Sequence, residues 1–412
     1  MISVKEASTI IQSNTKSFGE ELVAFQESQF RVLKEEIVAD RDFPPFNRVC
    51  MDGIAISEKA FLEGIRDFKI EGIQAAGSPQ LELKDYKNCI EIMTGSVLSK
   101  NADVVIPYEL VQIEKGTATV AVETVKKLQN IHLQGKDRKK GEILISENKI
   151  ITAAEIGVLA TVGKSEVLVE KQPKVMIVST GDELVEVSES PLNYQIRRSN
   201  VYSLVSLLKE LFISAETAHL PDDKVSLKAA ISKYLETYDV LLFSGAVSKG
   251  KFDFIPEVLE ELGVEKLFHK VKQRPGKPFW FGQRVAFDMS KQDVFKNKKQ
   301  TTIFAFPGNP ISTYVNCLKY FYPWYSKSIG IDSEKKEYAK LDSDVVFNPK
   351  MTYFLQVKIE NRLGEVIAIP FSGNGSGDLA NLADADAFIE LPAEVSEFKK
   401  GSIFPILRYR KF

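Results

Sequence analysis

Three short glycine-containing loops, two of which also carry serine and acidic residues, could together bind an anion and a metal ion. They comprise residues 179–184 (STGDEL), 244–253 (SGAVSKGKFD) and 307–310 (PGNP). Glycine lets a backbone approach a phosphate closely, and the N–H groups of a helix N-terminus can bind it. Carboxylate oxygens are ligands that Mg²⁺ accepts. One such loop also fits an ordinary strand-to-helix turn, whereas three at one sheet edge indicate a binding site.

The elements around these loops predict a doubly wound α/β domain over residues 173–330, with a parallel-rich sheet. The apolar runs at 175–178, 239–243 and 301–306 resemble buried strands, and each precedes one of the loops. Amphipathic helices follow, one of them with Asn200 at its capping position. In sheets of this kind, ligands bind beyond the carboxyl ends of the strands. The loops therefore lie where a ligand is expected.

Two further motifs occur in residues 31–147, where short apolar runs predict a β-rich domain. Asp52 lies in Met-Asp-Gly before an alternating apolar run, and Thr94 lies in Met-Thr-Gly at the end of a strand. Asp-Gly at such a place is a tight-turn signal. A plain turn is therefore the competing interpretation of Asp52.

A basic turn at residues 274–278 (RPGKP) is the third candidate for anion binding. Its two prolines restrict the backbone, so Arg274 and Lys277 would be presented at low entropic cost. A proline-stiffened loop with solvated charges is the competing interpretation of the same spacing.

The remaining segments predict supporting domains. Residues 3–30 are typical of one or two helices, beginning with the capping pattern Ser-Val-Lys-Glu. From residue 331 onward the pattern indicates strands. The glycine cluster at 373–377 lacks the spacing of a dinucleotide fingerprint, which favours a flexible loop.

The composition excludes several classes of protein. The 412 residues include 54 basic and 56 acidic side chains, and this balance argues against nucleic-acid binding by bulk charge. Three scattered histidines disfavour a zinc site. The three cysteines fit reduced thiols, and we see neither a signal peptide nor an apolar run of membrane-spanning length. We therefore expect a cytoplasmic protein that binds no membrane.

Six motifs occur together along the chain. They are FPPFNRVCMDGIA, IMTGSVL with the following ADVVIPYE, STGDEL, SGAVSKGKFDF, RPGKP and FPGNPIS. In this order they resemble the molybdopterin molybdenumtransferase family, the MoeA-like group that includes the E domain of gephyrin. The C-terminal GNGSGDLANLADADAFIELP is also similar to the last domain of that family. The resemblance thus covers nearly the whole chain.

The resemblance implies an elongated four-domain protomer that forms a homodimer. Its domains would be a helical N-terminal linker domain (1–30 and 148–172), a β-rich inserted domain (31–147), an α/β molybdopterin-binding domain (173–330) and a C-terminal β domain (331–412). The cleft would form between the α/β domain and the β-rich domain of the partner subunit. The family inserts molybdate into adenylated molybdopterin in a Mg²⁺-dependent step that releases AMP. Other proteins of molybdenum cofactor biosynthesis are further expected partners.

The positions that match the family's motifs would divide by role. The catalytic residues would be Asp52, Thr94, Glu183 and Asp253. The Mg²⁺ ligands would be Asp52, Glu183, Asp253 and one or both of Asp222 and Asp223. Backbone donors and fixed cations for the adenylate could come from Gly245, Ser248, Gly250, Arg274 and Lys277. The other residues that would contact the ligand are Gly181, Asp182, Ser244, Pro307, Gly308, Asn309, Ser312 and Ser376.

Some positions depart from the family's pattern. Ala246 stands where a second glycine is usual, and Arg274 replaces a usual lysine while keeping its charge. None of the matching acidic residues is lost, which favours an enzyme. The alternatives are a molybdopterin adenylyltransferase, which would leave the Asp52 and Thr94 motifs unexplained, and a non-catalytic molybdopterin-binding scaffold.

Overall fold

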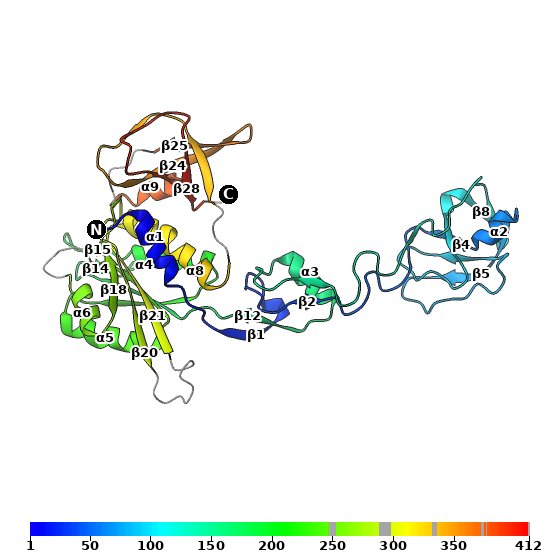
Figure 1. Cartoon of the computed structure of the whole chain (residues 1–412), viewed down its shortest axis with the longest axis horizontal. Helices are drawn as coiled ribbons and strands as arrows, with labels where there is room; N and C mark the ends of the chain where they lie inside the picture. The colour runs from blue at the N-terminus through cyan, green and yellow to red at the C-terminus, as the bar shows by residue number, and fades with distance from the viewer. Residues whose placement is uncertain are drawn as a thin grey trace. The chain divides into compact units, whose positions relative to one another are not determined.

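The computed structural model describes residues 1–245, 247, 253–287, 298–331, 336–371, 375 and 377–410. The chain divides into two compact units. The first comprises Met1–Leu22, Phe30–Lys34 and Leu168–Phe412, and the second comprises Val23–Gln29 and Glu35–Val167. Figure 1 labels the elements of both units. No helix in the described part of the chain is both long enough and apolar enough to cross a membrane.

The first unit is built on a mixed six-stranded sheet with the order β16-β13-β17-β21-β20-β18. Its strands are β16 (Ala215–Leu220), β13 (Val175–Thr180), β17 (Val240–Ser244), β21 (Lys298–Phe306), β20 (Trp280–Phe287) and β18 (Glu265–His269). The first four run parallel. Strand β20 runs antiparallel to β21, and β18 pairs antiparallel with β20, so β18 runs in the direction of the first four. The expectation of a parallel-rich α/β sheet is therefore confirmed, with antiparallel pairing at one side.

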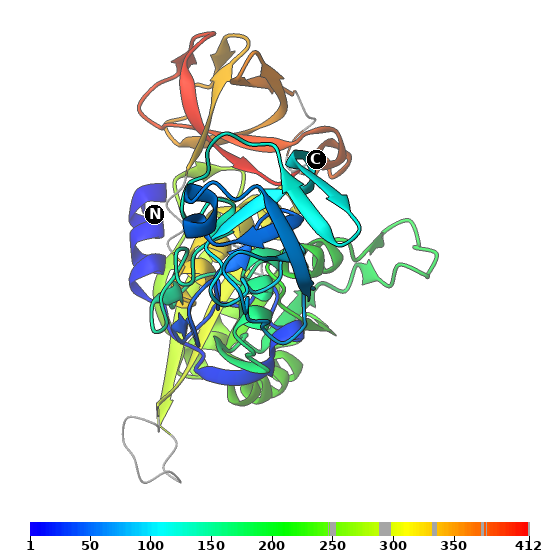
Figure 2. The ribbon, with the colours of Figure 1, turned by 90° about the vertical axis from the view of Figure 1, so that its right-hand side faces the viewer.

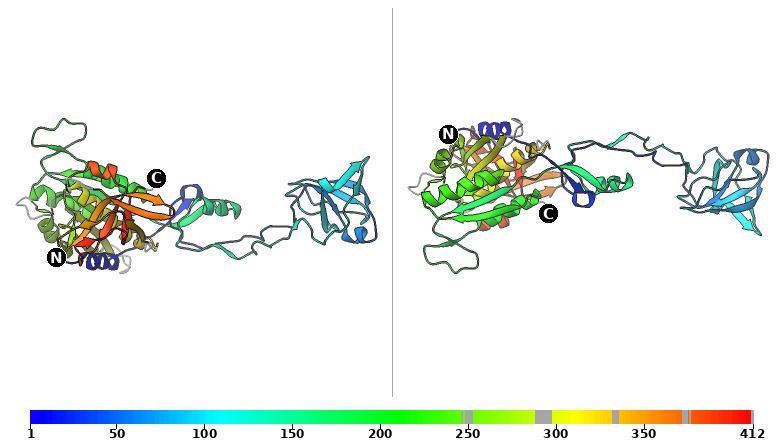
Figure 3. Two further views of the ribbon diagram at one scale, coloured as in Figure 1. Left: turned by 90° about the horizontal axis from the view of Figure 1, so that it is seen from above. Right: turned by 90° about the horizontal axis from the view of Figure 1, so that it is seen from below.

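Both faces of this sheet are covered, which explains the nearly continuous apolar strands. Side chains of β17 alternate between two cores: Val240 and Leu242 face one, and Leu241 and Phe243 face the other. The first core also contains residues of α1 (Val4–Ser13), α4 (Asn200–Glu210), α7 (Pro310–Asn316) and α8 (Tyr322–Ser328). The second contains residues of α5 (Lys224–Thr237) and α6 (Ile255–Glu261). The segment between β14 (Leu184–Val185) and β15 (Ile196–Arg197) extends away from these layers in Figures 2 and 3.

A π-helical turn, η3 (Cys317–Phe321), joins α7 to α8. Such turns are rare and occur most often as single wide turns inside α-helices, frequently at functional sites. The helix that starts at the PGNP loop therefore changes its pitch after two turns.

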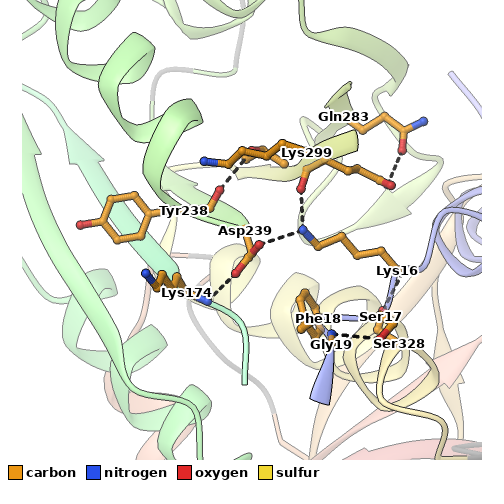
Figure 4. Close-up of polar contacts among 12 residues, drawn as sticks. Lys16, Ser17, Phe18, Gly19, Lys174, Tyr238, Asp239, Gln283, Lys299 and Ser328 are labelled. Carbon is orange, nitrogen blue, oxygen red and sulfur yellow. Dashed lines mark hydrogen bonds and ion pairs between the residues drawn. The ribbon is translucent and has the colours of Figure 1, made fainter. Parts of the chain in front are cut away.

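The N-terminal segment is anchored at the amino end of β17 (Figure 4). Ser3 and Glu6 form the expected capping box of α1. Beyond the helix, Lys16 Nζ lies 3.0 Å from Asp239 Oδ1, and the backbone N–H of Lys174 donates to Asp239 Oδ2 at 2.9 Å. Burial lowers the pKa of Lys16, while Asp239 opposes that shift. Lys16 and Asp239 thus form a half-buried ion pair, in which Asp239 also accepts a backbone hydrogen bond.

The prediction of one or two helices across residues 3–30 is correct only for α1, because the chain leaves the helix after Ser13 and only a 3-10 turn at Phe25–Glu27 follows. Residues Glu20–Ala24 form β1, which pairs with β12 (Glu166–Glu170). Gly19, with φ of +88°, separates this strand from the preceding chain. The pairing joins segments far apart in the sequence, so local propensity carried no sign of it.

The C-terminal residues form a second β structure within the first unit. It contains β19 (Gln273–Arg274), β24 (Thr352–Arg362), β25 (Glu365–Pro370), β22 (Glu337–Leu341), β28 (Ile403–Arg408) and β26 (Ala387–Leu391). Since β24 also pairs with β26, the last five strands close into a barrel. The expected C-terminal β domain is confirmed.

The second unit contains a six-stranded sheet with the order β7-β4-β6-β5-β9-β8. Its strands are β7 (Val104–Pro107), β4 (Gly53–Ile56), β6 (Cys89–Ile92), β5 (Asp67–Gln74), β9 (Thr117–Val120) and β8 (Val111–Glu114). Helix α3 (Ala153–Thr161) also lies in this unit and begins with a capping box from Thr152 and Glu155. The β-rich character expected from the sequence is present.

Candidate functional site

The three loops meet at the carboxyl edge of the parallel strands. Ser179 of β13 is paired with Ser244 of β17, which is paired with Phe306 of β21, so the strands end at one level. The backbone approaches are close: a Cβ added at Gly245, where φ is +109°, would lie 3.0 Å from the carbonyl oxygen of Thr180. The N–H of Gly245 donates to the carbonyl of Phe306 at 3.1 Å. Because Gly245 has no side chain, its backbone can lie close to Thr180. Its N–H is already hydrogen-bonded to Phe306.

A cavity of about 600 Å³ opens where these loops meet, and we call it the acidic cavity. Carboxylates from three different loops line it: Glu183, Asp222 and Asp253. Other expected ligand residues in its wall are Gly181, Ser244, Gly245, Pro307, Gly308 and Asn309. Ser248, Gly250 and Ser376 lie outside the described residues.

Asp222 carries the strongest electrostatic signature of this cavity. Its Oδ1 is buried and has no hydrogen-bond partner among the described residues. Burial, followed by the charges of Asp182 and Glu183, raises the pKa of Asp222, and Asp253 adds to this effect. A hydrogen bond from the backbone of Asp182 to the Asp222 carboxyl partly opposes the shift. In return, the backbone N–H of Asp222 donates to Asp182 Oδ1 at 3.2 Å. A cation placed here would relieve both the repulsion and the unpaired oxygen.

Asp223 has a different role from its neighbour. It is the N-cap of α5, where its Oδ2 accepts from the backbone N–H of Ser226 at 2.8 Å. Hydrogen bonds from the hydroxyl and from the backbone N–H of Ser226 lower the pKa of Asp223. Of the two aspartates that the sequence left as alternatives, only Asp222 lines the acidic cavity.

No three His, Cys, Asp or Glu side chains within the described ranges are already arranged as a metal site. Glu183 is folded back over its own loop, because a Cβ at Gly181 would lie 2.6 Å from Glu183 Oε2. Mg²⁺ commonly takes one or two carboxylates and completes its shell with waters and substrate phosphates. The unpaired Asp222 oxygen beside other carboxylates fits that kind of site, and it does not fit a closed protein cage.

Sequence reasoning missed Asn200 as a residue that joins the loops. Its Nδ2 donates to Ser244 Oγ at 2.9 Å and to the carbonyl of Gly308 at 2.7 Å. The side chain therefore links the second loop to the third from the start of α4. From the sequence, Asn200 was interpreted only as a helix-capping residue.

Arg198 was also missed, although it lines the acidic cavity. The residue is 7% exposed and forms an ion pair with Glu186, yet its Nε has no hydrogen-bond partner among the described atoms. A buried guanidinium is costly unless it is paired. Nothing in the local sequence marks this arginine as buried.

The RPGKP turn lines a second cavity of about 610 Å³, which we call the turn cavity. It shares Pro278, Pro307 and Asn309 with the acidic cavity, so the two adjoin. Arg274 and Lys277 are exposed in its wall. The other lining groups include Ser312, Gln356, Tyr353, Phe354 and Phe371. Cationic and acidic groups thus occupy neighbouring cavities.

Asp52 and Thr94 lie together in the second unit. The backbone N–H of Thr94 donates to Asp52 Oδ1 at 2.6 Å, and this bond lowers the pKa of Asp52. Strands β4 and β6 bring the two motifs side by side, since Gly53 is paired with Ile92. Both side chains are exposed. The contact is compatible with a plain turn and with a functional pair.

A Cβ at Gly53 would lie 1.9 Å from the carbonyl oxygen of Ile106. Only glycine therefore fits between Asp52 and the neighbouring strand β7. The glycine of this motif is explained by packing alone.

Models of three protein regions match nearly the whole chain. They are the MoeA N-terminal region (domain I and II) over residues 2–163, a probable molybdopterin binding domain over residues 176–326, and the MoeA C-terminal region (domain IV) over residues 338–409. These matches follow one another in the order of the chain.

Similar proteins cover the same length. A molybdopterin molybdenumtransferase of Synechocystis is 39% identical over 98% of this chain and 99% of its own. A molybdopterin molybdenumtransferase of Staphylococcus epidermidis is 31% identical over 98% of this chain and 95% of its own. The crystal structure of a molybdopterin biosynthesis MoeA protein from Pyrococcus horikoshii superposes with a TM-score of 0.82 at 28% identity, covering 100% of both chains.

Proposed function

Because the chain belongs to the molybdopterin molybdenumtransferase family, and is a transferase of molybdenum cofactor biosynthesis, we propose a specific reaction for it. It inserts molybdate into adenylated molybdopterin and releases AMP in a Mg²⁺-dependent step. The observation that carries this proposal is the acidic cavity, in which Asp222 keeps a buried, unpaired oxygen beside other carboxylates. That arrangement suits a cation that also contacts phosphate.

Asp222, Glu183 and Asp253 would hold Mg²⁺ at this cavity, with Asp52 as a further ligand. When bound, the metal supplies positive charge beside the adenylate phosphates. The chain itself contributes the position of the loops: Asn200 holds the loops around Ser244 and Gly308 together.

Arg274 and Lys277 would bind the anionic partner in the adjoining turn cavity. Two cations fixed in one turn can hold either the terminal phosphate of molybdopterin or the incoming molybdate. The adjoining walls at Pro278, Pro307 and Asn309 support a single ligand that spans both cavities.

We also propose a cytoplasmic homodimer whose protomers have the four-domain division expected from the sequence. Asp52 and Thr94 belong to the second unit, whereas the acidic cavity belongs to the first. In the proposed dimer, each site takes Asp52 and Thr94 from the partner subunit. Mixing inactive Asp52→Ala and Asp253→Ala proteins should then restore about one quarter of wild-type activity through heterodimers with one intact site. No recovery after verified subunit exchange would contradict composite sites.

The reaction is tested by incubating the protein with adenylated molybdopterin, Mg²⁺ and varied molybdate. We expect AMP release that depends on both molybdate and Mg²⁺. AMP release at the same rate without molybdate would contradict insertion. Formation of adenylated molybdopterin from ATP and molybdopterin would instead support an adenylyltransferase.

A further inference from the structure

The RPGKP turn is held from behind by three buried polar residues. Gln273 and Asn316 are completely buried, and Tyr320 is 1% exposed. Gln273 Nε2 donates to the carbonyl of Pro275 at 2.9 Å, and Asn316 Nδ2 donates to the carbonyl of Gly276 at 3.3 Å. Both carbonyls that separate Arg274 from Lys277 therefore accept a hydrogen bond from a buried amide.

The hydrogen bonds of this network run in one direction. The hydroxyl of Tyr320 donates to Gln273 Oε1, and Gln273 Nε2 also donates to Asn316 Oδ1 at 2.8 Å. Burial raises the pKa of Tyr320, so its hydroxyl keeps the proton that it donates. The reverse orientation of the Gln273 amide would place its oxygen against the carbonyl of Pro275. Each amide orientation is thereby determined by its neighbour.

The same network fixes the distance between the turn and the helix. A Cβ at Gly276, where φ is +87°, would lie 2.8 Å from both Asn316 Oδ1 and Gln273 Nε2. Asn316 ends α7, and Tyr320 lies in the π-helical turn η3 that follows. The ring of Tyr320 stacks on Phe279, just beyond the turn, at 4.9 Å. The end of α7 and the π-helical turn that follows it thus each supply one residue that reaches Gln273.

Helix α7 also begins at the PGNP loop, whose Asn309 lines both cavities. One helix therefore presents the PGNP loop at its first turn and holds the RPGKP turn at its end. We infer that Gln273, Asn316 and Tyr320 are positioning residues for the transferase reaction, which fix Arg274 and Lys277 over the turn cavity. This inference rests on the proposed role of those two cations in anion binding.

The first step of the test is to find whether the RPGKP turn affects the affinity for molybdopterin or the KM for molybdate. The affinity for molybdopterin is measured by calorimetry, and the KM for molybdate is measured from AMP release, for wild type, Lys277→Ala and Arg274→Ala. Loss of one charge-assisted contact should weaken one of these constants by roughly 10- to 150-fold. If neither constant changes in either variant, the proposed role of the turn is wrong and the inference falls with it.

The second step uses Tyr320→Phe, which removes only the hydroxyl and keeps the ring against Phe279. We expect it to weaken the constant that Lys277 controls by about 3- to 10-fold while changing kcat less than twofold, on the order of one hydrogen bond. Asn316→Ala should act in the same direction. The matched control is Tyr322→Phe: this phenol lies two residues further along and donates to the carbonyl of Leu207 at 2.7 Å, away from both cavities. Tyr322→Phe should lower Tm without changing the binding constant that Lys277→Ala weakens.

A double-mutant cycle separates positioning from general destabilisation. Because Tyr320 acts through the turn, adding Tyr320→Phe to Lys277→Ala should weaken binding by less than about twofold further. Fully additive effects, or an unchanged constant in both Tyr320→Phe and Asn316→Ala while Lys277→Ala is impaired, would overturn this inference alone. An equal loss of affinity in Tyr322→Phe would also overturn it.

Discussion

The two edges of the α/β sheet differ in how completely their carboxylates are paired. At the amino edge, Asp239 is paired with Lys16 and also accepts from the backbone of Lys174 (Figure 4). At the carboxyl edge, Asp222 has an oxygen without a partner among the described residues, and burial together with the neighbouring carboxylates raises its pKa. The charges at the amino edge are therefore paired, whereas an oxygen at the carboxyl edge remains available to the Mg²⁺ proposed above.

The largest effect should come from removing a carboxylate of the acidic cavity. Asp253→Ala should lower Mg²⁺-dependent AMP release by about 100-fold, comparable to the loss of one electrostatic contact in other active sites. The Tm of the variant, measured in parallel, separates a loss of metal binding from a loss of folded protein. Unchanged Mg²⁺-dependent turnover would remove Asp253 from the metal site.

At the amino edge we expect a substitution to lower the stability and leave the activity unchanged. Lys16 and Asp239 have side chains 12% and 31% exposed, so Lys16→Met leaves a carboxylate poorly compensated. We expect a loss of about 1–3 kcal/mol in the free energy of unfolding, below the value for a fully buried pair. Urea denaturation measures this loss, and the kcat of the folded variant should remain at the wild-type level.

The matched control is Lys340→Met, which breaks the ion pair between Lys340 and Glu365. The side chains of this pair are 39% and 60% exposed, respectively. It should change the free energy of unfolding by less than about 0.5 kcal/mol. Equal losses in both variants would contradict a special role for the amino edge.

The smallest effect should be a gain of stability at Asp222. Since the folded-state pKa of Asp222 is raised, the native protein holds this proton to a higher pH than the unfolded chain. Its contribution to stability is therefore largest at low pH and is lost as the pH rises from the ordinary aspartate range through the raised value. Without metal at neutral pH, Asp222→Asn should stabilise the protein by roughly 0.5 kcal/mol, because the side chain is partly exposed.

Thermal unfolding of the metal-free proteins, followed from about pH 4 to pH 7, checks this sign. The Tm difference between Asp222→Asn and wild type should grow as the pH rises. A variant that is less stable than wild type at neutral pH would show that Asp222 makes a stabilising contact.

Local patterns predicted the loops well and the contacts between distant segments poorly. The strand–loop–helix order was enough to place Glu183, Gly245 and Pro307 at one sheet edge, because parallel strands end together. The Lys16–Asp239 pair joins residues 223 positions apart, and the Gln273–Asn316 bond joins residues 43 apart. Neither pair has a local signature. The same reason explains why β1 was mistaken for helix.

Asp222 and Asp223 provide the most direct test of the acidic cavity. They are adjacent and chemically identical, but one lines the cavity and the other caps α5. The measurement is the Mg²⁺ concentration that gives half-maximal AMP release in Asp222→Asn and Asp223→Asn. We predict an increase of about tenfold or more for Asp222→Asn, and an unchanged value for Asp223→Asn, because asparagine caps helices as well as aspartate does. Wild-type Mg²⁺ dependence in Asp222→Asn would contradict the account.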